Sequence, residues 1–306
     1  MCVGVDDPYE RYRDELVAAG LLIPSGVAGV FGLGGAFEGV VEALERLITR
    51  EGADLGAEVH RYPPIFNRAH YTAMDHVRNF PDLLGSVHSF TGKDAEHKEL
   101  VRKLDAGEDW TSALTPAEVM LIPAACYPLY PTATGTLPAK GRVVDLRSFV
   151  FRHEPSPDPA RMQIFRQREY VRLGSADEAL AHRDEWIERG LAIHRSRGLA
   201  VEAVVANDPF FGRGGRLAKA TQREQALKFE LVVPICSAEK PTAITSCNYH
   251  RDYFGHAFDI RTPDGAPAHT ACVGFGLERC TLALFKTHGF DLERWPHEVR
   301  QRLGLE

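Results

Sequence analysis

The chain has 306 residues, of which 44% are hydrophobic and 25% are charged, a composition typical of a globular protein with a sizeable core. The net charge of -6 and the pI near 6.1 give no bulk attraction for polyanions and disfavour a dedicated nucleic-acid binder. We expect a cytoplasmic protein, because the sequence shows neither a signal peptide nor a run approaching the roughly eighteen apolar residues of a membrane span.

The cysteines are scattered along the chain, which fits buried thiols in a reducing compartment better than a disulfide framework. They lie at Cys2, Cys126, Cys236, Cys247, Cys272 and Cys280. No Cys-x-x-Cys pair occurs, so any metal site has to be assembled from distant parts of the chain.

The first third of the chain is predicted to be a helical region followed by a strand. Residues 5–50 have helical character, and apolar residues recur at amphipathic spacing after a glycine-rich turn at 29–35. This turn lacks the lysine of a phosphate-binding P-loop, so we interpret it as the start of a helix. Residues 58–65 read as a strand that the prolines at 63 and 64 stop.

Two further segments precede the most informative stretch. A charged helix is predicted over residues 94–105, and residues 121–131 form an apolar run, interrupted by prolines, that holds Cys126.

Residues 151–170 are predicted to form a long hairpin. Prolines and other turn-forming residues at 155–159 separate two extended runs. Side chains on a strand alternate between its faces, so Arg152 and Glu154 should share one face of the first run.

By the same alternation, Phe165, Gln167 and Glu169 should share one face of the second run. A cation, carboxylates and an aromatic ring would then lie on one sheet surface. This set suits a nucleoside triphosphate, with a guanidinium on phosphate oxygens and a ring against the base. The alternative is a solvated hairpin with charged faces.

A second helix and a basic loop follow the hairpin. Ser175 and Glu178 form a predicted capping box that opens a helix ending near Gly198, and a strand is expected over 199–205. The inward-facing residues of this helix are predicted to be Leu180, Trp186, Ile187 and Leu191.

Residues 207–219 are rich in glycine and locally basic. They are interpreted either as a mobile surface loop or as a docking element for an acidic partner or a phosphate-bearing arm. The candidate docking residues are Arg213, Arg216 and Lys219.

The C-terminal third contains a predicted strand that runs into a helix. Glycines bound the strand at 274–276, and Arg279 falls in the first turn of the helix, where it and the helix N-terminus can face a phosphate. Strands are also expected at 228–231 and 245–248, and a last helix at 292–303.

These stretches together resemble the three motifs of class II aminoacyl-tRNA synthetases. Motif 1 corresponds to about 36–66, motif 2 to 151–170 and motif 3 to 272–285. The resemblance implies an α+β fold with a mostly antiparallel sheet flanked by helices, in a single catalytic domain over residues 1–306. Motif 1 forms the dimer interface in that family, so a homodimer is expected.

The resemblance also implies roles at an ATP site. Arg152 would contact the α-phosphate, Glu154 the adenine amino group and Arg161 the outer phosphates. Phe165 would stack on the adenine, and Arg279 would offset the charge that develops during the reaction.

Magnesium contacts are implied at Glu230 and Ser246. The match is imperfect there, because Ala243 occupies a place where ordinary seryl enzymes carry a carboxylate for magnesium.

Cys126, Glu169 and Cys272 fall around the expected amino-acid pocket. Two thiolates and a carboxylate suit a zinc site with an open coordination position, which the α-amino group of a substrate would fill. The alternative is unligated core cysteines with Glu169 in an ion pair.

With these residues the chain resembles the atypical zinc-dependent seryl-tRNA synthetases and their truncated relatives, the amino acid:[carrier protein] ligases. About 150 residues precede motif 2 and leave no room for a tRNA-binding domain, which favours the ligases. The implied reaction uses ATP to activate a small amino acid, glycine or alanine, and transfers it to the phosphopantetheine thiol of an acyl carrier protein.

Two other functions stay open. One is a minimal seryl-type aminoacyl-tRNA synthetase that uses only acceptor-stem contacts. The other is a non-catalytic regulatory paralogue that binds ATP or an amino acid. No tRNA partner and no membrane partner are expected.

Overall fold

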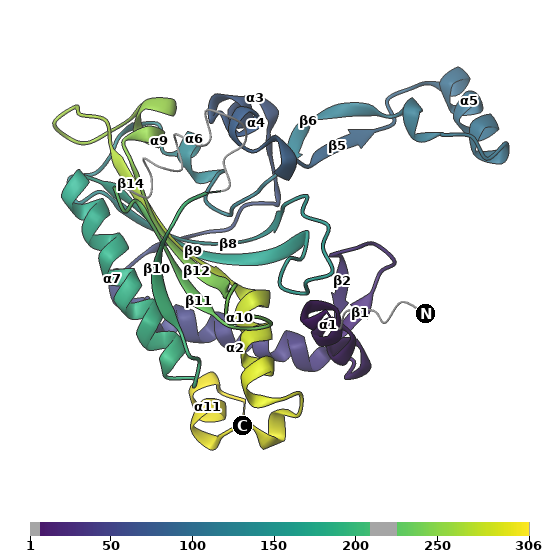
Figure 1. Ribbon diagram of the computed structural model, residues 1–306. Coiled ribbons are helices and arrows are strands. Elements are labelled where there is room, and N and C mark those ends of the chain that lie inside the picture. Colours follow the sequence, from purple (N-terminus) through teal and green to yellow (C-terminus); the bar gives the residue numbers. More distant parts are fainter. Residues whose placement is uncertain (1–6, 209–224, 306) are drawn as a thin grey trace.

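The fold is built on a seven-stranded sheet, seen in a computed structural model that describes residues 7–208 and 225–305. Five of its six neighbouring strand pairs are antiparallel, and the pair of β3 and β8 is parallel (Figure 1). The mostly antiparallel sheet expected from the sequence is therefore confirmed. In spatial order the strands are β10 (Glu202–Ala206), β11 (Lys228–Val233), β12 (Thr242–Arg251), β14 (His269–Gly276), β9 (Ile164–Gly174), β8 (Arg142–Phe151) and β3 (Glu58–His60).

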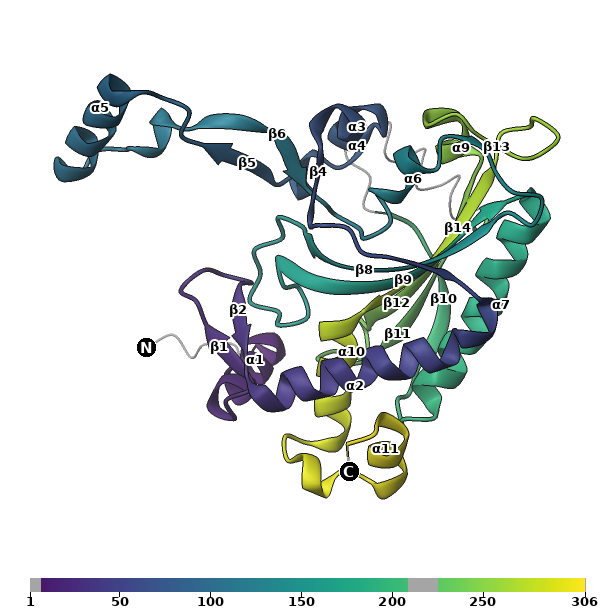
Figure 2. The same ribbon diagram turned by 180° about the vertical axis from the view of Figure 1, so that it is seen from behind.

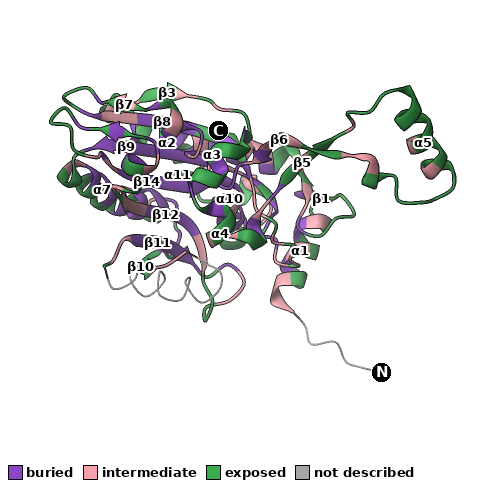
Figure 3. Cartoon of the chain, turned by 90° about the horizontal axis from the view of Figure 1, so that it is seen from above, coloured by how far each residue is buried: buried purple, intermediate pink, exposed green. Residues whose placement is uncertain are grey.

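Three helices pack against one face of this sheet (Figures 1 and 2). They are α2 (Gly35–Glu51), α7 (Ala176–Arg195) and α10 (Leu277–His288). Trp186 of α7 stacks on Tyr170 of β9 with ring centroids 4.9 Å apart, and Phe37 of α2 meets Phe285 of α10 at 5.8 Å. Figure 3 shows the buried residues concentrated along these strands and helices. The opposite face of the sheet is left for the site.

Helix α7 begins as the sequence predicts. The hydroxyl of Ser175 accepts from the backbone N–H of Glu178, whose carboxylate accepts from the backbone N–H of Ser175. The inward position predicted for Leu180 is wrong, because the buried stripe runs through Ala179 and Arg183, and Leu180 is 38% exposed. No helix in residues 7–208 or 225–305 combines the length and apolar character needed to cross a membrane.

The helical prediction for residues 5–50 is partly wrong. A hairpin of β1 (Leu22–Pro24) and β2 (Phe31–Leu33) separates α1 (Pro8–Ala18) from α2. Gly26 and Gly29 have φ of +85° and +73°, conformations that favour a turn over a helix. Gly34 is the N-cap of α2, so the glycine-rich turn does lead into a helix.

An arm extends from the body of the molecule (Figures 1 and 2). It consists of β5 (Ser86–Ser89), α5 (Asp94–Asp105) and β6 (Thr115–Leu121), and β6 also pairs with β4 (Ile65–Asn67). The charged helix predicted over 94–105 is confirmed, and none of its residues is buried.

Short helices gather beyond the open face of the sheet, at the top of Figure 1. They are α3 (Arg68–Ala73), α4 (His76–Asn79), α6 (Leu129–Thr132) and α9 (Tyr253–Ala257). The parallel pair of β7 (Gly135–Thr136) and β13 (Ile260–Arg261) lies beside them.

Proline explains two boundaries that differ from the predicted ones. The strand expected over 58–65 is divided into β3 and β4, with prolines at 63 and 64 between them. The helix expected over 292–303 is divided by Pro296 into a 3₁₀ turn, Leu292–Arg294, and α11 (His297–Leu303). The strand expected over 199–205 is β10, which begins at Glu202.

Candidate active site

A cavity of about 1190 Å³ lies on the open face of the sheet. This volume exceeds the roughly 300–1,000 Å³ of common single-ligand pockets. Phe165, Gln167 and Glu169 of β9 all line it, as their alternation along the strand predicts. Strands β11, β12 and β14 contribute two residues each, in order Lys228, Glu230, Ser246, Asn248, Cys272 and Gly274.

Arg152 and Glu154 reach the cavity from just beyond the end of β8, whereas the sequence placed them on a strand. The backbone N–H of Arg152 donates to the carbonyl of Gln163 at 2.8 Å, which still pairs the two sides of the hairpin. The Nε of Arg152 donates to the carbonyl of Pro123 at 3.0 Å. Glu154 lies 3.6 Å from a guanidinium nitrogen of Arg161. Arg152, Glu154 and Arg161 thus lie close together as predicted, although β8 ends at Phe151, before the first two of them.

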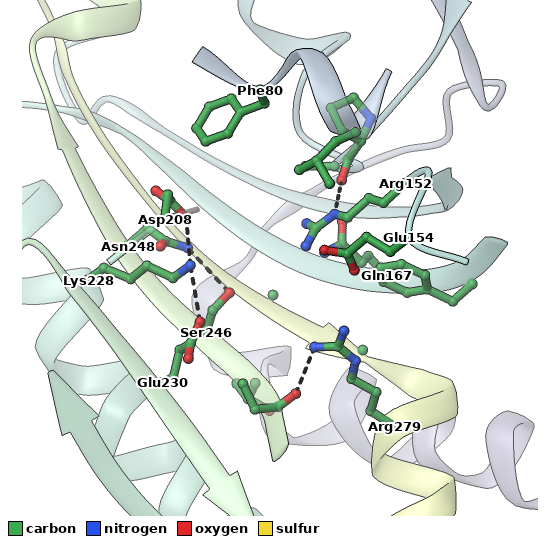
Figure 4. A pocket seen from close by; sticks show the side chains of 18 of the residues that line it. Phe80, Arg152, Glu154, Gln167, Asp208, Lys228, Glu230, Ser246, Asn248 and Arg279 are labelled. Atoms are coloured by element: carbon green, nitrogen blue, oxygen red, sulfur yellow. Dashed lines mark hydrogen bonds and ion pairs between the residues drawn. The ribbon is translucent and has the colours of Figure 1, made fainter. Parts of the chain in front are cut away.

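Arg279 enters the cavity from the first turn of α10, as predicted (Figure 4). Its guanidinium donates to the carbonyls of Ala160 at 2.7 Å and Ala243 at 3.1 Å. It also lies 5.8 Å from the centroid of the Phe165 ring. Burial, followed by the nearby positive charge of Arg152, lowers the pKa of Arg279 to about 10, so the group stays charged at neutral pH.

Phe165 is therefore the floor of an arginine-rich end of the cavity. The guanidinium of Arg152 lies 5.6 Å from its ring centroid, and Arg152 and Arg279 face each other across the site in Figure 4. Arg152, Arg161 and Arg279 all line this end, which has the charge and the aromatic surface that a nucleotide needs.

Glu230 lies on β11 directly opposite Ser246 of β12, so the two residues predicted for magnesium are neighbours. The carboxylate of Glu230 is not isolated, because the Nζ of Lys228 lies 3.1 Å from it and 2.6 Å from the carboxylate of Asp208 (Figure 4). Burial opposes the charge of Lys228, but Asp208 and Glu230 together raise its pKa. Neither Lys228 nor Asp208 is among the predicted site residues, although the spacing of 228 and 230 puts both side chains on one strand face.

Cys126, Glu169 and Cys272 form a compact cluster at the other end of the cavity. One ligand atom from each lies within 4.8 Å of the others, and all three side chains are buried. One oxygen of Glu169 accepts from the backbone N–H of Ala125 at 3.2 Å, whereas the other is buried and has no hydrogen-bond partner among residues 7–208 and 225–305. Burial and the adjacent Cys272 raise the pKa of Glu169 to about 8.

The pKa values of the two thiols in the cluster are shifted in opposite directions. A hydrogen bond from Cys126 lowers the pKa of Cys272, and the same hydrogen bond raises the pKa of Cys126. The side-chain amide of Asn248 donates to the sulfur of Cys272 at 3.5 Å, and the Nε2 of His250 lies 3.6 Å from it. Two sulfurs and an unpartnered carboxylate oxygen are donors that suit zinc, so the residues present fit the predicted metal.

A mostly aromatic wall completes the cavity, and the sequence analysis missed it. Phe80 lies across the cavity from Arg279 in Figure 4. His76 is hydrogen-bonded through Nδ1 to the hydroxyl of Tyr127 at 3.0 Å, and burial lowers its pKa to about 4. The hydroxyl of Tyr253 donates to the carbonyl of Met74 at 2.6 Å. His76 and Phe80 lie four residues apart at α4, but Tyr127 and Tyr253 come from a distant loop and from α9, so no sequence period connects the whole wall.

The predicted docking residues Arg213, Arg216 and Lys219 lie outside the described residues.

Solved structures with a similar fold include two seryl-tRNA synthetases, of which this chain covers about three fifths. The Methanopyrus kandleri seryl-tRNA synthetase, solved with a tRNA from A. aeolicus, matches 96% of this chain and 60% of its own chain with a TM-score of 0.82 and 21% identity. The Pyrococcus horikoshii seryl-tRNA synthetase, solved with ATP, matches 96% of this chain and 62% of its own with a TM-score of 0.69 and 16% identity. The protein thus has the fold of a class II aminoacyl-tRNA synthetase catalytic domain.

Sequence relatives narrow this class. Amino acid--[acyl-carrier-protein] ligase 1 of Bradyrhizobium diazoefficiens is 43% identical over 99% of this chain and 91% of its own length. Ligase 2 of the same organism is 46% identical over 98% of this chain and 88% of its own length. The chain belongs to the amino acid--[acyl-carrier-protein] ligase family and is an enzyme of the ligase class.

A more distant relative is the type-2 serine--tRNA ligase of Methanopyrus kandleri. It is 28% identical over 60% of this chain and 37% of its own length. No protein-family model matches the sequence.

Proposed function

We propose that this ligase uses ATP to activate glycine or alanine as an aminoacyl adenylate and transfers the aminoacyl group to the phosphopantetheine thiol of an acyl carrier protein. The observation that carries this proposal is the meeting, in one cavity, of the arginine-rich end around Phe165 and the Cys126, Glu169 and Cys272 cluster. The first suits a nucleotide and the second an amino acid held by its amine. The names of the two Bradyrhizobium relatives support the acyl carrier protein as acceptor.

ATP would lie against Phe165, with its adenine on the ring and its amino group near Glu154. Arg152 would contact the α-phosphate, Arg161 the outer phosphates, and Arg279 the α-phosphate from the opposite side. Two of these guanidiniums already lie within 6 Å of the ring, which supports a common binding position. We place magnesium at Glu230 and Ser246, where it would neutralise charge on the phosphates when bound.

The amino acid would bind at the other end, by its α-amine. Cys126, Glu169 and Cys272 would hold zinc, which supplies a Lewis-acidic position for that amine when bound. Gly274 lies next to this cluster, and a Cβ added there would lie at an ordinary van der Waals distance of 3.6 Å from Glu169 and Ser246. The preference for glycine or alanine rests on the resemblance described above.

The chemistry requires no protein nucleophile. A carboxylate oxygen of the amino acid attacks the α-phosphorus, the bond to the bridging oxygen of the β-phosphate breaks, and pyrophosphate leaves. The thiol then attacks the adenylate carbonyl, loses its proton, and AMP leaves as the thioester forms. Arg152 and Arg279 would stabilise the charge that develops on the phosphoryl oxygens in the first step.

The proposal is tested by incubating the protein with ATP, magnesium and labelled glycine or alanine, together with a phosphopantetheinylated carrier protein or bulk tRNA. We expect label on the carrier and none on tRNA. Label on tRNA alone would identify a minimal synthetase instead. Ligand binding without pyrophosphate exchange would identify a regulatory paralogue, and either result would overturn the proposal.

We also propose that the phosphopantetheine arm enters along the wall that carries Phe80. This wall lies opposite Arg279, so an arm there can reach the adenylate carbonyl without displacing the nucleotide. Its apolar surface suits the hydrocarbon parts of the arm. A homodimer and docking of the carrier through Arg213, Arg216 and Lys219 are part of the same proposal.

Replacing Phe80 by alanine should therefore reduce transfer to the carrier by about tenfold, because the phosphopantetheine arm loses an aromatic contact. Pyrophosphate exchange, which reports adenylate formation alone, should fall by much less. Phe90→Ala is the matched control. Phe90 contacts the ring of His97 in the segment of β5, α5 and β6, much as Phe80 contacts that of His76, but Phe90 does not line the cavity. Equal losses in both assays for Phe80→Ala would contradict this route.

A further inference from the structure

One side chain connects the three motif regions, and it points away from the cavity. Arg166 follows Phe165 on β9 and therefore faces the helices on the opposite side of the sheet. Its Nε donates to one oxygen of Glu278 at 2.7 Å, and its backbone N–H donates to the other at 2.7 Å. The two terminal nitrogens donate to the two oxygens of Glu38 on α2, each at 2.8 Å.

Arg166 and Glu278 are the chain neighbours of two residues of the proposed nucleotide site. Arg166 follows Phe165, on which the adenine is proposed to stack, and Glu278 precedes Arg279, whose guanidinium lies 5.8 Å from the centroid of the same ring. The contact between Arg166 and Glu278 therefore fixes how β9 and the start of α10 lie relative to each other. The hydrogen bonds to Glu38 connect the start of α2 to the same guanidinium.

The surroundings make this contact rigid. Glu278 is 2% exposed and the side chain of Arg166 is 14% exposed, so solvent screens their interaction little. The guanidinium also lies 5.4 Å from the centroid of the Phe149 ring. A fork with bonds to two carboxylates allows fewer alternative geometries than a lysine would.

We propose that Arg166 is a positioning residue for ATP. It holds Phe165 and Arg279 in register across the nucleotide site and ties both to α2, although it touches no substrate itself. A displacement of about 1 Å at a reacting site can cost on the order of 100-fold in rate, so a register that is fixed from behind the sheet matters for activation. This inference rests on the proposed use of ATP.

The test is pyrophosphate exchange by Arg166→Gln, measured separately against ATP and against the amino acid. We expect the KM for ATP to rise at least about tenfold and the KM for the amino acid to stay within about twofold, since Glu169 and both cysteines lie on the other face. Arg166→Lys should give an intermediate KM for ATP, because it keeps the charge and loses the fork. Zinc content should match the wild type in both variants.

Arg172→Gln is the matched control. Arg172 lies on the same face of β9, is 16% exposed and pairs with Glu178. Its neighbour on β14 is Ala271, several residues before Glu278 and Arg279. It should leave the KM for ATP unchanged. Equal rises in Arg166→Gln and Arg172→Gln, or a rise in the KM for both substrates, would overturn the proposal.

If Arg166→Gln does not fold, Glu38→Gln tests the same proposal with a smaller change. Glu38 is 37% exposed, so Glu38→Gln removes one carboxylate at small cost in stability and should raise the KM for ATP about two- to threefold. An unchanged KM would overturn the role of α2. Absence of pyrophosphate exchange in the wild type would instead contradict the proposed function.

Discussion

Replacing Cys272 by alanine is expected to abolish binding of the proposed zinc ion and to reduce activation of the amino acid by at least about 100-fold. The substitution leaves one sulfur and one carboxylate, which is too few ligands to hold zinc at a substrate site. It also leaves Glu169 buried with an unpartnered oxygen and no metal to bind it. Metal analysis of protein prepared without chelator measures the loss directly, and pyrophosphate exchange measures its consequence.

Cys247→Ala is the control for this prediction. Cys247 is also buried, and it lies on β12 one residue before Asn248, facing away from the cluster. This variant should keep zinc at one equivalent per chain. Wild-type protein without stoichiometric zinc, or a Cys272→Ala variant that retains it, would refute the assignment of the metal.

Replacing Arg279 by alanine should reduce pyrophosphate exchange by about 10²- to 10³-fold, the usual range for loss of one group that stabilises transition-state charge. The side chain is held in place by two carbonyls, so its charge is positioned before ATP binds. The KM for ATP should rise as well, because the contact across the Phe165 ring is lost. Zinc content should stay unchanged, which separates this defect from that of Cys272→Ala.

Arg279→Lys provides the comparison. Lysine keeps the positive charge but lacks the planar fork that reaches Ala160 and Ala243, so its activity should fall between wild type and alanine. Exchange at the wild-type rate in Arg279→Ala would show that this arginine does not take part in activation.

The parts of the site that were predictable lie on regular elements. Alternation along one strand predicts that Phe165, Gln167 and Glu169 face the same cavity, and the start of a helix predicts the direction of Arg279. The capping box also predicts the start of α7, and the helix predicted over 94–105 has the bounds of α5.

The missed parts depend on tertiary packing. His76 and Tyr127 are 51 residues apart, and neither lies in a periodic segment. The strands of the hairpin that divides α1 from α2 have three residues each, too short to show a period of two. Glycine conformations, rather than a hydrophobic pattern, decide the structure there.

The single strand β9 has a consequence for which substrates the enzyme can accept. It carries both Phe165 and Glu169, four residues apart, so the proposed adenine and amine positions would be separated by about 13 Å of backbone at roughly 3.3 Å per residue. A β-amino acid held by its amine would carry its carboxylate one extra methylene away, a shift of about 1.5 Å relative to the α-phosphate. With the substrates bound as proposed, the strand would set a fixed spacing that selects α-amino acids over their β-homologues, whatever the size of the side chain.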